Sequence, residues 1–170
     1  MNPKIFIPLI FIFLGIGYLG YNVFLASQTI PEIQYGQDKC DNCGMVISEK
    51  KYSAIAYSIN EERWVKFDDI GGLFIYIVKH DGKEKFKDIY VFDFNTGERV
   101  SAYDAYYVKG HPDKIWTPMS SGIIVFKSLA DAESYASNVD GMVMTFEELY
   151  TWVYNNPEKV FQGMDMNMKM

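Results

Sequence analysis

Cysteine, histidine and basic residues are scarce in this chain, and each shortage narrows the range of functions. The 170 residues include two cysteines and two histidines, and 16 lysines and arginines stand against 22 aspartates and glutamates, for a formal net charge of −6. Nucleic-acid binding depends on lysine and arginine patches that meet phosphates, and no such patch is visible. Aromatic residues make up 16% of the chain. A compact core is therefore expected without a disulfide scaffold, and a disordered chain is not.

Charged residues are absent between Lys4 and Glu32, and this gap contains a long apolar run. Residues 5–26 read IFIPLIFIFLGIGYLGYNVFLA, and about 20 apolar residues suffice to cross the hydrocarbon core of a bilayer. A cleaved signal peptide, the alternative, has a shorter apolar region and small residues before its cleavage site, where this chain has Phe24. We predict an uncleaved, single-pass anchor at residues 1–26. The positive charge of Lys4 favours a cytoplasmic N-terminus and an extracytoplasmic domain.

Breaker residues and composition divide the rest of the chain. Residues 27–37 contain Pro31 and Gly36 and are predicted to form a linker. Residues 38–160 form the predicted domain, and residues 161–170 form a flexible, methionine-rich tail.

The predicted domain repeats one order of elements. Residues 52–59 and 63–67 predict a hairpin, and helical spacing follows from residue 70 with Asp68 or Asp69 as the cap. A second strand ends at Phe126, and a second helix with Ser128 and Asp131 at its start follows. The remaining predicted elements are a strand at 88–94, a strand over 99–110 and a closing helix at 145–156. We therefore predict an α+β domain of two similar strand-strand-helix units after the N-terminal transmembrane helix.

Cys40 and Cys43 form a C-x-x-C motif within the sequence DKCDNCGMVI, and several kinds of site compete for it. Haem attachment requires a histidine directly after the second cysteine, where this chain has Gly44. Zinc needs four ligands, but there is no third cysteine, and His80 and His111 show no pairing motif. Haem is excluded, and zinc is disfavoured.

Two sulfur chemistries stay open at the same motif. A thioredoxin-like redox pair would place Cys40 at the start of a helix, whereas the residues after Gly44 have a strand-like pattern. A structural disulfide between Cys40 and Cys43 is natural outside the cytoplasm. Such a bridge would close a very small loop and stabilise the fold little.

A soft cation is the remaining interpretation, because Cu(I) prefers thiolate and thioether ligands. Cys43 and Met45 are two residues apart, so in an extended chain both side chains project on one face. Gly44 leaves the approach free, and such a chelate has room for a partner's ligand. The chain end offers the same chemistry, and we predict an exchangeable Cu(I) collector there, with a frayed terminus as the alternative. Its thioethers belong to Met164, Met166, Met168 and Met170.

Five segments, in order, resemble the NosL family of copper-handling accessory proteins in bacterial nitrous oxide reductase maturation. They are CDNCGM, FDDIGGL, YVFDF, TPMSSGIIVF and DGMVMTFEEL, spread over about residues 38–149. The resemblance implies a non-enzymatic chaperone in the cytoplasmic membrane with its domain in the periplasm. Such a protein delivers Cu(I) to apo nitrous oxide reductase, together with the membrane transporter complex of the same assembly system. It implies ligands at Cys43 and Met45, with Met119 as a third. Cys40 is then a supporting ligand or a redox partner.

Family members are commonly lipoproteins, whereas this chain offers an uncleaved helix. Two other functions stay open: a membrane-anchored thiol-disulfide oxidoreductase using Cys40 and Cys43, and an assembly factor whose cysteines only staple a loop. Ordinary roles are expected for several further residues. These are helix capping for Asp68 and Asp69, exposed loop positions for His80 and His111, and core packing for Trp116, Met142 and Met144.

Overall fold

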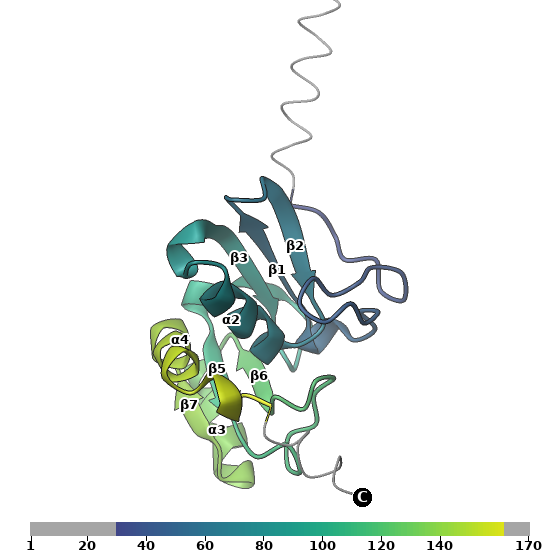
Figure 1. Cartoon of the computed structure of the whole chain (residues 1–170). Helices are drawn as coiled ribbons and strands as arrows, with labels where there is room; N and C mark the ends of the chain where they lie inside the picture. The colour runs from purple at the N-terminus through teal and green to yellow at the C-terminus, as the bar shows by residue number, and fades with distance from the viewer. Residues whose placement is uncertain (1–29, 162–170) are drawn as a thin grey trace, which may run out of the picture. The chain divides into compact units, whose positions relative to one another are not determined.

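The computed structural model describes residues 30–161, and this part of the chain folds into two antiparallel sheets with helices packed against them (Figure 1). Residues 33–161 belong to one compact unit. Within the described range, no helix combines the length and the apolar character that crossing a bilayer requires. The anchor predicted at residues 5–26 lies outside that range, as do the tail methionines.

The first sheet has the strand order β2-β1-β3-β4. Strands β1 and β2 form the predicted hairpin, with Ala56 opposite Val65. Helix α2 follows directly and begins where the Asp69 side chain accepts a hydrogen bond from the Gly71 N–H at 2.7 Å. The elements are β1 (Ala54–Ser58), β2 (Arg63–Phe67), α2 (Ile70–Lys79), β3 (Phe86–Phe92) and β4 (Arg99–Ser101), with 3₁₀ turns η1 (Lys50–Tyr52) and η2 (Lys83–Lys85).

The second sheet has the strand order β6-β5-β7 and two helices. Ser128 caps α3, and Thr145 caps α4 in a full capping box with Glu148. The elements are β5 (Tyr106–Lys109), β6 (Ile123–Phe126), α3 (Leu129–Val139), β7 (Met142–Met144) and α4 (Phe146–Asn155), with 3₁₀ turns η3 (Ala102–Asp104) and η4 (Pro157–Lys159).

The two halves share one topology. In the first, β1, β2, α2 and β3 follow in sequence and the sheet order is β2-β1-β3; in the second, β5, β6, α3 and β7 give β6-β5-β7. The caps Asp69 and Ser128 occupy equivalent positions, each two residues after the final phenylalanine of the preceding strand. The prediction of an α+β domain with two similar strand-strand-helix units is confirmed.

Helix α2 lies at the centre of the core, where it packs against α4 and the first sheet (Figure 1). Phe74 contacts the rings of Tyr107 and Phe146, with centroid distances of 5.4 and 5.1 Å. All three side chains are buried, and each contributes about 1.5–3 kcal/mol of burial free energy. The helix thereby joins the two halves.

One predicted strand is wrong. The single strand predicted over residues 99–110 is interrupted by the turn η3, because β4 ends in the first sheet and β5 begins the second. The Tyr107 hydroxyl closes this crossing by donating to the Ala102 carbonyl at 2.7 Å. The segment after Gly44, which has a strand-like pattern, begins as a loop and the turn η1, where the Ser53 hydroxyl donates to the Lys50 carbonyl at 2.7 Å, and then enters β1.

Candidate metal centre

The C-x-x-C motif lies in a tight loop that precedes β1. A bridge between Lys39 and Val46 closes the base of this loop. Inside it, the Cys40 N–H donates to the Met45 carbonyl and the Gly44 N–H donates to the Cys40 carbonyl, both at 2.8 Å. Gly44 has φ +77°, a left-handed conformation that glycine adopts readily. The chain is therefore not extended between Cys43 and Met45, and the alternation argument for that pair is wrong.

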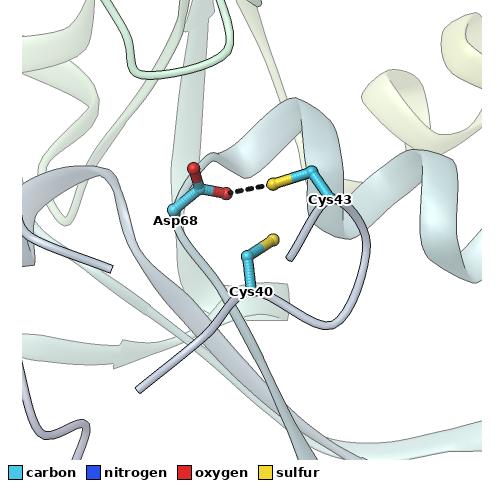
Figure 2. A group of neighbouring side chains, drawn as sticks. All are labelled: Cys40, Cys43 and Asp68. Carbon is cyan, nitrogen blue, oxygen red and sulfur yellow. Dashed lines mark hydrogen bonds between the residues drawn. The ribbon is translucent and has the colours of Figure 1, made fainter. Parts of the chain in front are cut away.

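Three potential ligands converge at this loop (Figure 2). One sulfur each from Cys40 and Cys43 and a carboxylate oxygen of Asp68 lie within 4.8 Å of one another. The Cys43 thiol donates to Asp68 Oδ1 at 3.6 Å. Cys40 and Asp68 are buried, whereas Cys43 is exposed, and both cysteines are free thiols. Within residues 30–161, no second group of histidine, cysteine or acidic side chains is placed this closely.

The pKa values of both cysteine thiols are raised, because burial outweighs the hydrogen bonds that lower them. Burial raises the pKa of the Cys40 thiol, and the Asp68 carboxylate raises it further, while the backbone N–H groups of Asp68 and Cys43 partly offset this. Burial also raises the pKa of Cys43, against the N–H of Met45. Thiols must lose their protons to ligate a metal. A cation that enters this loop therefore releases protons and finds backbone N–H groups already facing the sulfurs.

Asp68 and Asp69 are adjacent but face different parts of the molecule. Asp69 is fully buried and caps α2, which confirms the capping prediction for this residue. Burial raises its pKa, against hydrogen bonds from Ser121 and Thr117. Asp68 instead faces the cysteines. A signal for this difference is present in the sequence, since successive side chains of an extended segment project to opposite faces. Only one of the two aspartates can therefore cap the helix.

Met119 lies beside the loop that carries the cysteines. It is 7% exposed, and its N–H donates to Asp69 Oδ2 at 3.0 Å. A Cβ placed on Gly72 would lie 3.3 Å from Met119 Sδ and 3.5 Å from Asn42 Nδ2. Asn42 stands between the two cysteines in the sequence. The thioether and the C-x-x-C loop thus meet over the first turn of α2.

Met45 and the two histidines, the other ligand candidates among the described residues, are exposed. Met45 belongs to the loop, and its side chain is 42% exposed. His80 and His111 are exposed, as predicted, and neither joins the cysteine cluster. His80 stacks on Tyr76 with ring centroids 3.8 Å apart.

Core packing was predicted for three residues and holds for one of them. Met144 is buried on β7, whereas Met142 on the same strand is 52% exposed. The prediction of a core position for Trp116 is wrong, because this residue is 63% exposed. Its ring meets that of Tyr52 edge-on, with the ring centroids 5.4 Å apart.

The fold and the cluster define an α+β domain of two duplicated units with a thiol- and carboxylate-lined loop suited to a metal ion. The NosL family model matches residues 32–153, so the chain belongs to the NosL family. No curated protein matches the sequence. The chain is similar in fold to the crystal structure of the copper chaperone NosL from Shewanella denitrificans, with 22% identity and a TM-score of 0.62. The match covers 71% of this chain and 95% of that one.

Proposed function

We propose that this protein is a non-enzymatic copper chaperone that binds Cu(I) in the loop of Cys40 and Cys43. One observation carries the proposal: two free thiols converge in one loop, and the Asn42 side chain of that loop and the buried thioether of Met119 approach the same position over Gly72. Thiolate and thioether sulfurs are the ligands that Cu(I) prefers. The crystallised structural relative is itself described as a copper chaperone, which supports the same cargo here.

The ligands divide into a buried and an exposed side. Cys40 and Met119 are buried, whereas Cys43 and Met45 are exposed. We assign Cys43 as the central thiolate, with Met45 and Met119 as thioether ligands and Cys40 as the supporting thiol. Asp68 is a hard oxygen donor and a poor match for Cu(I); it orients the Cys43 thiol through their hydrogen bond. The exposed side gives a partner's ligand access to the ion.

The proposed client is apo nitrous oxide reductase, reached with the membrane transporter complex of its assembly system. The motifs shared with the NosL family motivate this assignment, and residues 5–26 would anchor the chain to the membrane with the domain in the periplasm. A direct test incubates the Cu(I)-loaded chain with the apo reductase and measures copper in the reseparated proteins. Copper that stays on the chaperone would rule out this client.

The metal assignment is tested by anaerobic competition between the reduced full chain, in detergent, and a chromophoric Cu(I) chelator. Losing an outer-shell partner of a metal site costs about 10–100-fold in affinity, so Cys43→Ser is expected to cost more than about 100-fold. Met119→Leu keeps the apolar volume but removes the thioether, and it is expected to weaken binding less. A wild-type chain that fails to compete would refute the chaperone proposal.

The alternative of a thiol-disulfide oxidoreductase predicts a different pattern. That activity requires Cys40 and Cys43 equally and reduces a test disulfide, whereas the chaperone depends on Cys43 and the neighbouring thioethers. The partner variants Cys40→Ser and Met45→Ala separate the two functions. Loss of disulfide reduction in Cys40→Ser, together with unchanged copper binding in Met45→Ala, would favour the oxidoreductase.

A further inference from the structure

The loop that carries Cys40 and Cys43, here called the cysteine loop (residues 39–46), is attached to strand β2 through Asp41. Strand β2 lies at the edge of the first sheet, and an edge strand presents unpaired backbone N–H and C=O groups. The Asp41 N–H donates to the Lys66 carbonyl at 2.8 Å, and Asp41 Oδ2 accepts from the Lys66 N–H at 2.7 Å. One residue of the loop therefore satisfies both backbone groups of Lys66.

This attachment defines the register between the cysteine loop and the chain that leaves β2. Asp41 and Lys66 are 25 positions apart, and Cys43 and Asp68, whose side chains share a hydrogen bond, are also 25 positions apart. The equal offset means that the two segments run side by side in the same direction over these residues. A slip of one residue would place a neighbour of Cys43 opposite Asp68 instead. The contact of Asp41 with Lys66 thus determines where the Cys43 thiol lies.

An ion pair holds the Asp41 side chain from a second direction. Asp41 Oδ1 lies 2.8 Å from Arg63 Nη1. Glu61 orients the same guanidinium group from the other side, at 2.6 Å from Nη2, and accepts a hydrogen bond from the Tyr76 hydroxyl at 2.5 Å. Tyr76 belongs to α2. The cysteine loop is therefore connected to strand β2 directly, and to helix α2 through this chain of polar contacts.

We propose that Asp41 is a positioning residue of the metal centre, which holds the cysteine loop in the register that brings the two thiols together before an ion arrives. This inference rests on the proposed function of the loop. Both carboxylate oxygens of Asp41 are engaged by Arg63 and the Lys66 N–H, so Asp41 acts through its neighbours Cys40 and Cys43 and not as a ligand. Residues that orient metal ligands in this way typically contribute about 10–100-fold to metal affinity.

The first test compares Cu(I) affinities of the reduced full chain, in detergent, by anaerobic competition with bicinchoninate. Asp41→Ala removes both carboxylate contacts and is expected to weaken binding about 10–100-fold. Asp41→Asn keeps an oxygen that can accept from the Lys66 N–H but loses the charge that pairs with Arg63, so its loss should be smaller. Glu98→Ala is the matched control and should bind like wild type, because it removes a carboxylate that pairs with Lys127 on the surface.

Urea unfolding of the same variants separates positioning from a general loss of stability. The Cu(I) titration is carried out without urea, where the folded state is populated. If Asp41 contributed only to the stability of the fold, Asp41→Ala would have a lower urea midpoint but would keep the affinity of wild type for Cu(I). Wild-type affinity in Asp41→Ala would therefore overturn the proposal.

A second probe separates the positioning role from the copper assignment. Phenylarsine oxide condenses with two neighbouring thiols, forming two arsenic–sulfur bonds and releasing water, so its binding requires converging thiols but no thioether. We expect wild type to bind it and Asp41→Ala to bind it about tenfold more weakly. Equal binding in the two proteins, or none in wild type, would overturn the positioning role. If this difference appears but wild type does not compete for Cu(I), the copper function fails and the positioning of the thiols stands.

Discussion

Gly71, in the first turn of α2, has no room for a side chain, and we expect Gly71→Ala to destabilise the fold. A methyl group there would lie 2.5 Å from Ser121 Cβ and 2.9 Å from Val160 Cγ1. Overpacking of this kind costs about 1–3 kcal/mol. Replacing glycine by alanine in a helix returns at most about 1 kcal/mol. A contact of 2.5 Å with a Cβ atom places the cost in the upper part of that range, about 2–3 kcal/mol. The clash therefore outweighs the gain in helix propensity, and the net loss is about 1–2 kcal/mol.

Urea unfolding followed by circular dichroism measures this loss. With a slope of about 2 kcal/mol per molar urea, the middle of the usual range, the midpoint of Gly71→Ala should fall by about 0.5–1 M. Gly72→Ala is the matched control, because its nearest neighbour is the flexible tip of Met119 at 3.3 Å; its midpoint should stay near the wild-type value. A Gly71→Ala midpoint equal to or above that of Gly72→Ala would refute the close-packing argument.

Three further predictions concern single residues. Thr145→Ala removes the capping box of α4 and should cost about 1 kcal/mol, read as a lower melting temperature; an unchanged value would contradict the cap's contribution. Burial opposes ionisation of Asp93, but hydrogen bonds from the N–H groups of Lys127, Thr96 and Asn95 lower its pKa overall. The stabilisation that ionised Asp93 provides is therefore complete above the unfolded pKa of about 3.9, and it is lost as pH falls through the lower folded pKa. In Asp93→Asn, the free energy of unfolding should therefore depend less on pH below about pH 4 than in wild type. Burial and, to a smaller extent, the charge of Asp68 raise the pKa of Cys43. Asp68→Asn removes the smaller contribution, so alkylation by iodoacetamide at neutral pH should accelerate modestly; a slower reaction would contradict this sign.

Most of the helical framework could be predicted from sequence because its signals are local. The apolar spacing from Ile70 and the caps Asp69 and Ser128 each act within one turn, and the structure has helices at both places. The break between β4 and β5 was not predictable in this way. Residues 99–110 carry a continuous strand pattern, and only the pairing of distant strands assigns their two ends to different sheets.

The candidate site shows the same limit. The spacing of Cys40 and Cys43 is visible in the sequence, but the contribution of Asp68 depends on a contact across 25 positions. Trp116 was expected in the core because its side chain is large and aromatic, and yet it is exposed. Hydropathy does not record which side of a loop faces solvent. Cys43 and Met45 were expected on one face of an extended chain, with Gly44 leaving space between them. The same glycine adopts a left-handed conformation, which ends the extended chain at this point.

The duplicated topology has an evolutionary consequence. Asp68 and Lys127 occupy matching positions immediately before the two helix caps, but Asp68 meets the cysteines, whereas Lys127 pairs with Glu98 on the surface. The pseudo-symmetry of the backbone is thus not repeated in its chemistry. Because Met119 belongs to the second copy and Cys43 to the segment before the first, neither copy alone holds the whole proposed ligand set. Mutations in the second copy can therefore tune metal affinity while the cysteines stay untouched.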